Sequence, residues 1–149
     1  LMYLEYDQKL KTDVKLKILD SVCLDHIIYC NYFAGVFNAK LKDKAKANLY
    51  FFKTANQIKN IFNKAQKIAL YEHHMATRWA DFLAYMYLYA DLDKETKILV
   101  EECINYMYQK NFNLVIKHYE INLKNLSENK YSKTKEKKYP YIESIIKKN

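Results

Sequence analysis

The sequence predicts an all-α protein that folds as a compact bundle of five to six helices. The first observation is the near absence of turn residues: the 149 residues include one glycine and one proline, where an average protein has about 7% and about 5%. The second is that apolar residues recur three and four positions apart, as in amphipathic helices. We expect one helical domain over residues 1–126, then a basic, partly flexible C-terminal extension over 127–149 with a short amphipathic segment.

The longest predicted helix spans residues 13–41 and is expected to be a central helix of the bundle. One side of this helix carries the expected core stripe given below. The opposite side is also apolar between Ile27 and Phe37, which is typical of a helix covered on several sides. Gly35 lies in its middle, where glycine costs about 1 kcal/mol relative to alanine, so we expect another helix to cross closely there. The residues expected to form its core stripe are Leu16, Leu19, Cys23, Ile27, Cys30, Ala34, Phe37 and Leu41.

A second helix is predicted over residues 49–71, after a charged turn at 40–48. Residues 72–77 are expected to form a kink or a loop. The following segment, 78–90, is apolar nearly all round and is expected to be the other half of the buried centre. The core stripe predicted for the helix over 49–71, which has a basic outer face, comprises Phe51, Ala55, Ile58, Phe62, Ala65 and Ala69.

The last part of the predicted domain follows an Asp-Leu-Asp turn. Asp93 is a residue type that favours the N-cap, and the apolar spacing after it predicts a helix from Lys94 to Gln109. Around Asn111 the helix either breaks or continues to Leu126, and the sequence leaves both alternatives open.

The net charge of +8 is concentrated towards the C-terminal end. Residues 121–149 contain eight lysines and three glutamates, so the helical body is nearly balanced. The chain has 24 lysines but a single arginine, Arg78, and arginine supplies the bidentate contacts with which proteins read DNA bases. Sequence-specific DNA recognition is therefore not expected.

The three cysteines are too few for a disulfide framework. Cys23 and Cys30 lie on the predicted core stripe, about 10 Å apart along the helix axis, which is too far for a bridge. We expect reduced core thiols, which favours an intracellular, reducing compartment. The longest apolar run is shorter than the ~18 residues of a transmembrane helix, so no transmembrane segment is predicted.

No pattern in the sequence predicts a catalytic site or a cofactor. A nucleophile elbow and a phosphate-binding loop both need glycines, and Gly35 stands alone in a predicted helix. His73 and His74 follow Glu72, but adjacent helix positions point about 100° apart and cannot ligate one ion together. We expect a non-enzymatic protein without a metal or cofactor. A helical enzyme with a metal near His73 or His74 is the least favoured hypothesis.

Tyrosine is the most unusual feature of the composition, with 15 residues. Either the tyrosines fill the core and reach water with their hydroxyls, or some form a protein interface, where tyrosine is enriched. The primary hypothesis is an interaction module, or a subunit of a larger assembly, that binds a protein partner or a second copy through tyrosine-rich helix faces. The candidates, which alternate within two predicted helices and cannot all face one core, are Tyr85, Tyr87, Tyr89, Tyr106 and Tyr108.

The alternative hypothesis is a small nucleic-acid-binding subunit of a ribonucleoprotein complex. It would hold a polyanion with the basic tail and with Lys53, Lys59, Lys64 and Lys67. Residues 52–61 and the aromatic helix 82–90 resemble the small helical subunits of CRISPR effector complexes, in which a Thr-x-x-x-Ile/Leu-Arg-Asn helix start precedes a Tyr-rich helix ending in a basic residue. This chain has Lys59 where arginine is usual, and Asp91 after the aromatic helix. The resemblance implies a non-catalytic subunit that lines a nucleic-acid channel, but it covers at most residues 50–120 and is not a family assignment.

Overall fold

The computed structural model describes residues 13–68 and 70–128, and every regular element in these ranges is an α-helix. The all-α prediction is therefore confirmed for this part of the chain. Residues 1–12, Ala69 and most of the predicted C-terminal extension lie outside the described residues. None of the described helices is long and apolar enough to cross a membrane. The helices are α2 (Asp13–Lys40), α3 (Lys44–Lys64), α4 (Leu70–Leu88), α5 (Lys94–Gln109) and α6 (Asn113–Ser127).

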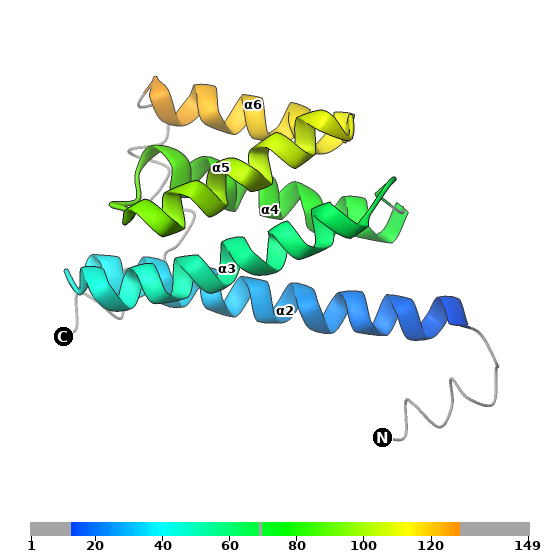
Figure 1. Ribbon diagram of the computed structural model, residues 1–149, viewed down its shortest axis with the longest axis horizontal. Helices are drawn as coiled ribbons and strands as arrows, with labels where there is room; N and C mark the ends of the chain where they lie inside the picture. Colours follow the sequence, from blue (N-terminus) through cyan, green and yellow to red (C-terminus); the bar gives the residue numbers. More distant parts are fainter. Residues whose placement is uncertain (1–12, 69, 129–149) are drawn as a thin grey trace.

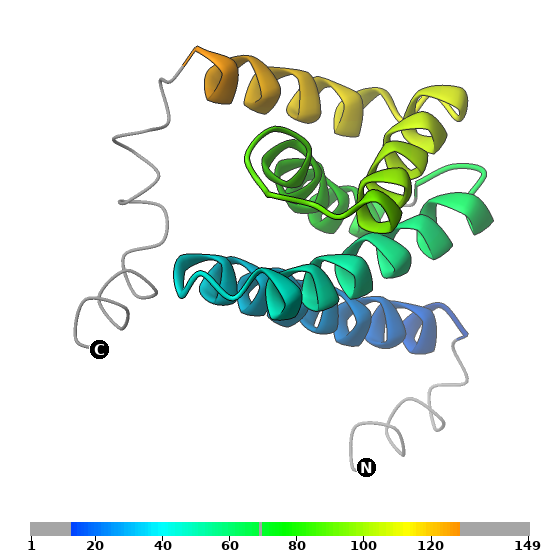
Figure 2. The ribbon, with the colours of Figure 1, turned by 60° about the vertical axis from the view of Figure 1, so that its left-hand side comes forward.

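The helices lie in three layers, with α2 and α3 in the first, α4 and α5 in the second and α6 in the third (Figure 1 and Figure 2). Helix α3 packs against α2 on one side and α5 on the other, while α4 packs mainly against α6. The layer of α4 and α5 therefore separates α2 from α6.

The core is built around α4. Seven of the eight residues from Trp79 to Met86 are buried, as expected for a segment that is apolar nearly all round. Tyr32 of α2 stacks on Phe82 with a centroid distance of 3.9 Å. Of the two alternatives for 72–77, a kink or a loop, the loop is wrong, because these residues lie within α4. The buried Met75 and Ala76 pack this stretch onto the core.

Helix α2 lies at the edge of the molecule, so the prediction of a central helix over 13–41 is wrong. Its middle buries Ile28, Tyr32 and Val36, which are four residues apart. On the predicted core stripe, Ala34 and Phe37 are half-buried, and the side chains of Leu16 and Leu19 are outside the description. The stripe lies opposite the face that α3 and α4 cover. The prediction that Cys23 and Cys30 are core thiols is therefore wrong, because both are exposed. The exposed members of the stripe are Cys23, Ile27, Cys30 and Leu41.

The close helix crossing predicted at Gly35 is confirmed. A Cβ atom at Gly35 would lie 2.6 Å from the ring of Phe51 on α3, well inside van der Waals contact. Phe51 is itself buried, so its ring has little room to move. The glycine therefore allows α2 and α3 to approach closely.

Helix α3 begins earlier and ends earlier than predicted, at Lys44 and Lys64 instead of 49 and 71. The turn before α3 covers residues 41–43 instead of the predicted 40–48. Within it, Lys42 adopts a left-handed φ of 61°. Asp43 caps the new start, since its carboxylate accepts a hydrogen bond from the Lys46 amide at 3.1 Å. The predicted core residues Phe51, Ala55, Ile58 and Phe62 are buried, whereas Ala65 is only half-buried.

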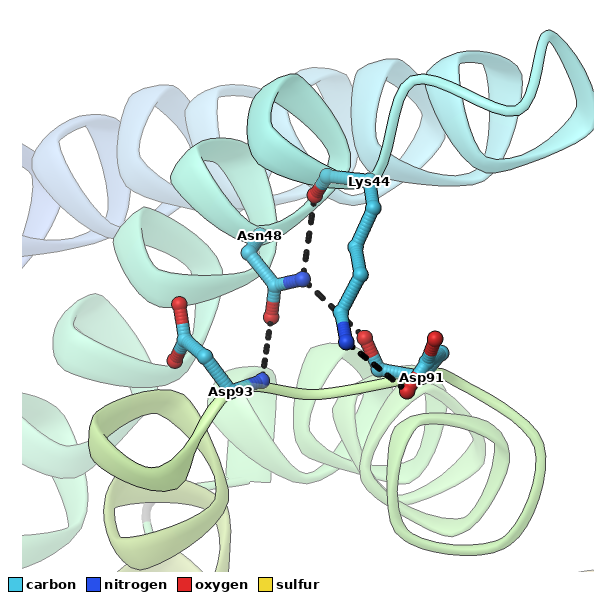
Figure 3. Close-up of polar contacts among 4 residues, drawn as sticks. All are labelled: Lys44, Asn48, Asp91 and Asp93. Atoms are coloured by element: carbon cyan, nitrogen blue, oxygen red, sulfur yellow. Dashed lines mark hydrogen bonds and ion pairs between the residues drawn. The ribbon is translucent and has the colours of Figure 1, made fainter.

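Asn48 holds the connection between α4 and α5 against the first turns of α3 (Figure 3). Its side-chain amide donates to the Asp91 carbonyl at 3.0 Å and accepts from the Asp93 amide at 2.9 Å. The Lys44 ammonium lies 3.3 Å from the Asp91 carboxylate. Together these contacts fix the end of α4 relative to the start of α5, and these two helices supply five of the seven residues of the site described below.

The two ends of α5 are well defined. Asp93 is its N-cap as predicted, and its carboxylate accepts a hydrogen bond from the Thr96 amide at 2.9 Å. The helix ends at Gln109, and Asn111 has a left-handed φ of 56°. Of the two alternatives for residues around Asn111, the helix breaks, and α6 leaves at a large angle to α5 (Figure 2).

Candidate functional site

An open groove of about 360 Å³ lies where α4, α5 and α6 meet. Helix α4 contributes Tyr87 from its last turn, and α6 contributes Tyr119 and Leu123, which are one turn apart. Helix α5 supplies the remaining residues from one face. The residues that line this tyrosine groove are Tyr87, Glu101, Ile104, Asn105, Tyr108, Tyr119 and Leu123.

The spacing within α5 explains why the groove forms here. Glu101, Ile104 and Tyr108 are three and four residues apart, so they lie on one face of the helix. The opposite face carries Leu99 and Cys103, which are buried in the core. One helix therefore packs the core and forms the floor of an open site.

Three phenol rings surround the groove. Tyr87 and Tyr108 are each 44% exposed, whereas Tyr119 is buried. The rings of Tyr108 and Tyr119 are 6.5 Å apart and nearly perpendicular, at 85°, which is a favourable edge-to-face arrangement. The groove thus offers two accessible ring surfaces backed by a fixed third ring.

The phenols of Tyr108 and Tyr119 stay protonated well above neutral pH. Partial burial, and secondarily the Glu120 carboxylate, raises the pKa of Tyr108. Burial also raises the pKa of Tyr119, with smaller contributions from Tyr108, Tyr87 and Glu120. These residues can therefore donate hydrogen bonds and present neutral ring faces, but they cannot supply a phenolate at neutral pH.

The five tyrosines proposed as an interface occupy different environments. Tyr87 and Tyr108 come together in the groove, and Tyr85 is buried in the core, where its ring contacts that of Tyr32. The Tyr89 hydroxyl donates to the Leu126 carbonyl at 2.6 Å and links α4 to α6. Tyr106 is half-buried, with the Lys110 ammonium 6.0 Å from its ring centroid.

Five of the seven groove residues were not among the sequence candidates: Glu101, Ile104, Asn105, Tyr119 and Leu123. Tyr119 and Glu101 show why. Tyr119 lies on the apolar face of α6, which predicts a core residue. Glu101 lies on the polar side of α5 and was expected to be only solvated. The apolar periodicity of α5 and of α6 shows on which side of its helix each of these two residues lies. No sequence signal shows that both sides border the same groove as Tyr87.

The four lysines proposed to bind a polyanion do not share one face. Lys59 forms an ion pair with Glu102 of α5 at 2.6 Å, and the hydrogen bond to Glu102 raises the pKa of Lys59. Lys53 is exposed, with its ammonium 5.4 Å from the Tyr50 ring centroid. Lys64 and Lys67 are exposed in the last turn of α3 and in the connection after it. Lys59 therefore faces a carboxylate instead of the basic outer face that the sequence predicts.

Histidine, cysteine, aspartate and glutamate side chains form no potential metal-binding group of three within the described residues. His73 and His74 lie in α4 and not in a loop. Comparisons with known proteins add no further candidate, because no family model, curated protein or solved structure matches the chain. The similarity to CRISPR effector subunits thus stays a sequence-based prediction.

Proposed function

We propose that this chain is a non-enzymatic interaction module, or a subunit of a larger assembly, whose tyrosine groove binds a protein partner. The observation that supports this proposal is the gathering of Tyr87, Tyr108 and Tyr119 from three helices around one open groove. Tyrosine combines a large apolar ring with a hydroxyl at little cost in side-chain entropy, which suits protein interfaces. Ile104 and Leu123 add apolar contact area beside the rings.

A basic side chain of the partner is the anchor that best matches this groove. Cations are attracted to the faces of tyrosine rings, a contact worth about 0.5–1 kcal/mol at exposed sites. The Glu101 carboxylate also lines the groove and adds an opposite charge. Asn105 supplies an amide that can bind the partner backbone.

A peptide selection tests the proposal with the full chain as bait. We expect random peptides enriched in lysine or arginine to be recovered. Their affinity should fall about tenfold or more in a Tyr87→Ala/Tyr108→Ala variant, which corresponds to about 1.4 kcal/mol. Glu101→Gln should weaken the same peptides, whereas the control Leu114→Ala, at a residue 45% exposed on α6, should not.

Two results would contradict this function. One is a selection that enriches no peptide above background. The other is a set of peptides that bind the double variant as tightly as the native chain. Recovery of acidic or purely apolar peptides that still depend on Tyr87 and Tyr108 would keep the groove as the binding site and remove the basic anchor.

The proposal retains a single helical bundle domain over residues 1–126 and a basic extension over residues 127–149. An extension of this charge would give a partner with acidic groups a second point of attachment. Within the described residues, the groove lies between α4, α5 and α6 and takes no residue from α2 or α3.

The second candidate function is binding of single-stranded nucleic acid as a subunit of a ribonucleoprotein complex. It is favoured by the pairing of Lys53 with the Tyr50 ring, since such sites combine cations with stacking rings. It is weakened by Lys59, which is neutralised by Glu102. Binding of a random oligonucleotide that weakens by orders of magnitude between about 50 and 200 mM salt would favour it.

A further inference from the structure

The outer face of α2, continued by Leu41 directly after the helix, carries an apolar stripe on the side away from α3 and α4, in which Ala34 and Phe37 are half-buried and the other members are exposed. We name it the α2 outer stripe, and it contains six members of the predicted core stripe. Ile27 is 49% exposed and Leu41 is 47% exposed, while the neighbouring Ile28 is completely buried on the opposite face. The members of the α2 outer stripe are Cys23, Ile27, Cys30, Ala34, Phe37 and Leu41.

The spacing of the α2 outer stripe is that of a helix-pairing seam. Its residues are separated by four, three, four, three and four positions, which is the heptad spacing of coiled-coil contacts. From Cys23 to Leu41 the seam is about 27 Å long at 1.5 Å per residue. Exposed apolar surface of this length is typical of an interaction site, and the heptad spacing suits a second helix as its occupant.

The order of these spacings reads the same in both directions. If two copies pair antiparallel about a two-fold axis at position 32, each stripe residue meets a stripe residue of the other copy: Cys23 meets Leu41, Ile27 meets Phe37, and Cys30 meets Ala34. A two-fold interface needs this kind of self-complementary patch. The small residues Cys30 and Ala34 next to the axis allow the two helices to approach closely.

Charge also favours a second copy as the occupant. The chain carries a net charge of +8, and +5 of it lies in residues 121–149, so an interface that includes this C-terminal part would bring like charges of two copies together. Residues 26–39 contain no lysine, arginine, aspartate or glutamate over 14 positions. Two copies can therefore meet along this part of α2 without bringing like charges together.

We propose that the chain forms an antiparallel homodimer through the α2 outer stripe. This inference does not depend on the tyrosine groove, to which α2 contributes no residue. The pairing places the two copies of α2 in the centre of the dimer and leaves α6, in the outermost layer, facing away (Figure 1).

Sedimentation equilibrium of the full chain under reducing conditions tests the dimer. We expect a dimer whose dissociation constant rises about 30-fold or more in Ile27→Lys, because in each copy an apolar contact with Phe37 of the other copy is replaced by a charge that the interface would bury. Ile121→Lys is the matched control, since Ile121 on α6 is also 49% exposed, and it should leave the dissociation constant unchanged. A native chain that stays monomeric at high concentration, or equal weakening by both variants, would overturn the proposal.

Disulfide trapping tests the orientation of the two helices. In a Cys30→Ser background, Leu41→Cys should form a covalent dimer on mild oxidation, and peptide mapping should find Cys23 joined to the new thiol at position 41. Within one chain these positions are about 27 Å apart along α2, so they cannot bridge. Links only between identical positions would indicate a parallel pair and overturn the antiparallel arrangement.

Discussion

The three cysteines occupy two different environments, and their chemistry differs accordingly. Cys23 and Cys30 are exposed on α2, while Cys103 is buried on α5. The Cys103 thiol donates to the Ala55 carbonyl at 3.2 Å. Burial, and secondarily the Glu102 carboxylate, raises the pKa of Cys103 to about 12, so almost no thiolate is present at neutral pH.

Alkylation should therefore separate the cysteines. With a maleimide at about pH 7, Cys103 should react orders of magnitude more slowly than Cys30 in the monomer, because it is both buried and protonated. Peptide mass spectrometry after timed quenching measures each rate, and the chain unfolded in urea provides the control in which all three react. Equal native rates at Cys103 and Cys30 would contradict the placement of α5.

Asp93 stabilises the start of α5 through its carboxylate. Hydrogen bonding to Thr96 lowers the pKa of Asp93. Because the pKa is lower in the folded protein than in the unfolded chain, the stabilisation is fully present above the unfolded value of about 3.9. It is lost as the pH falls through the lower folded-state value.

Asp93→Ala should reduce the free energy of unfolding by about 1 kcal/mol at neutral pH, as expected for loss of an N-cap. The difference from the native chain should shrink in strong acid, where the native carboxylate is also protonated. Asp93→Asn keeps an oxygen acceptor and should be closer to native at neutral pH. Urea unfolding at both pH values measures this, and a difference that does not change with pH would argue against the charged cap.

At the scale of elements, the crossing of α2 and α3 depends on a missing side chain. Gly35→Ala should destabilise the fold on the order of 1 kcal/mol, because overpacking against Phe51 costs about 1–3 kcal/mol and the gain in helix propensity is only about 1 kcal/mol. In a Phe51→Leu background the same substitution should cost less or stabilise. A Gly35→Ala chain more stable than the native one in thermal unfolding would exclude a tight crossing.

The bounds of α5 could be predicted from the sequence because they depend on signals within the helix itself. The range of α5 follows from its apolar spacing and the Asp93 cap, and both are confirmed. The orientation of α2 was predicted wrongly because both of its sides are apolar. The longer stripe through Ile27 and Cys30 indicates a core face as strongly as Ile28 and Tyr32 do. Only the positions of α3 and α4 decide which face is covered.

The candidate site was less predictable than the helices. Alternation correctly indicated that Tyr85, Tyr87 and Tyr89 could not all enter one core, since Tyr85 is buried and Tyr87 is exposed. The third ring of the groove, Tyr119, comes from a different layer (Figure 1). Its position depends on the left-handed break at Asn111, which sets the direction of α6.

At the scale of the whole molecule, the two proposed binding surfaces belong to different layers. The α2 outer stripe belongs to the first layer, and the tyrosine groove is lined by residues of α4, α5 and α6, the helices of the second and third layers (Figure 2). A dimer through α2 would leave both grooves accessible. It could then bind a partner with two sites more tightly than a single groove does, through effective concentration.

Helix α2 turns Ile28 inward and Ile27 outward, and the proposed dimer depends on this orientation. Lysine at each of these adjacent positions tests it directly, with urea unfolding followed by circular dichroism at a protein concentration low enough for a monomer. We predict that Ile27→Lys changes the free energy of unfolding by no more than about 0.5 kcal/mol. Ile28→Lys should lose about 3–5 kcal/mol or fail to fold, because it buries a charge and removes core contacts. A folded Ile28→Lys variant together with an unfolded Ile27→Lys variant would contradict this orientation of α2.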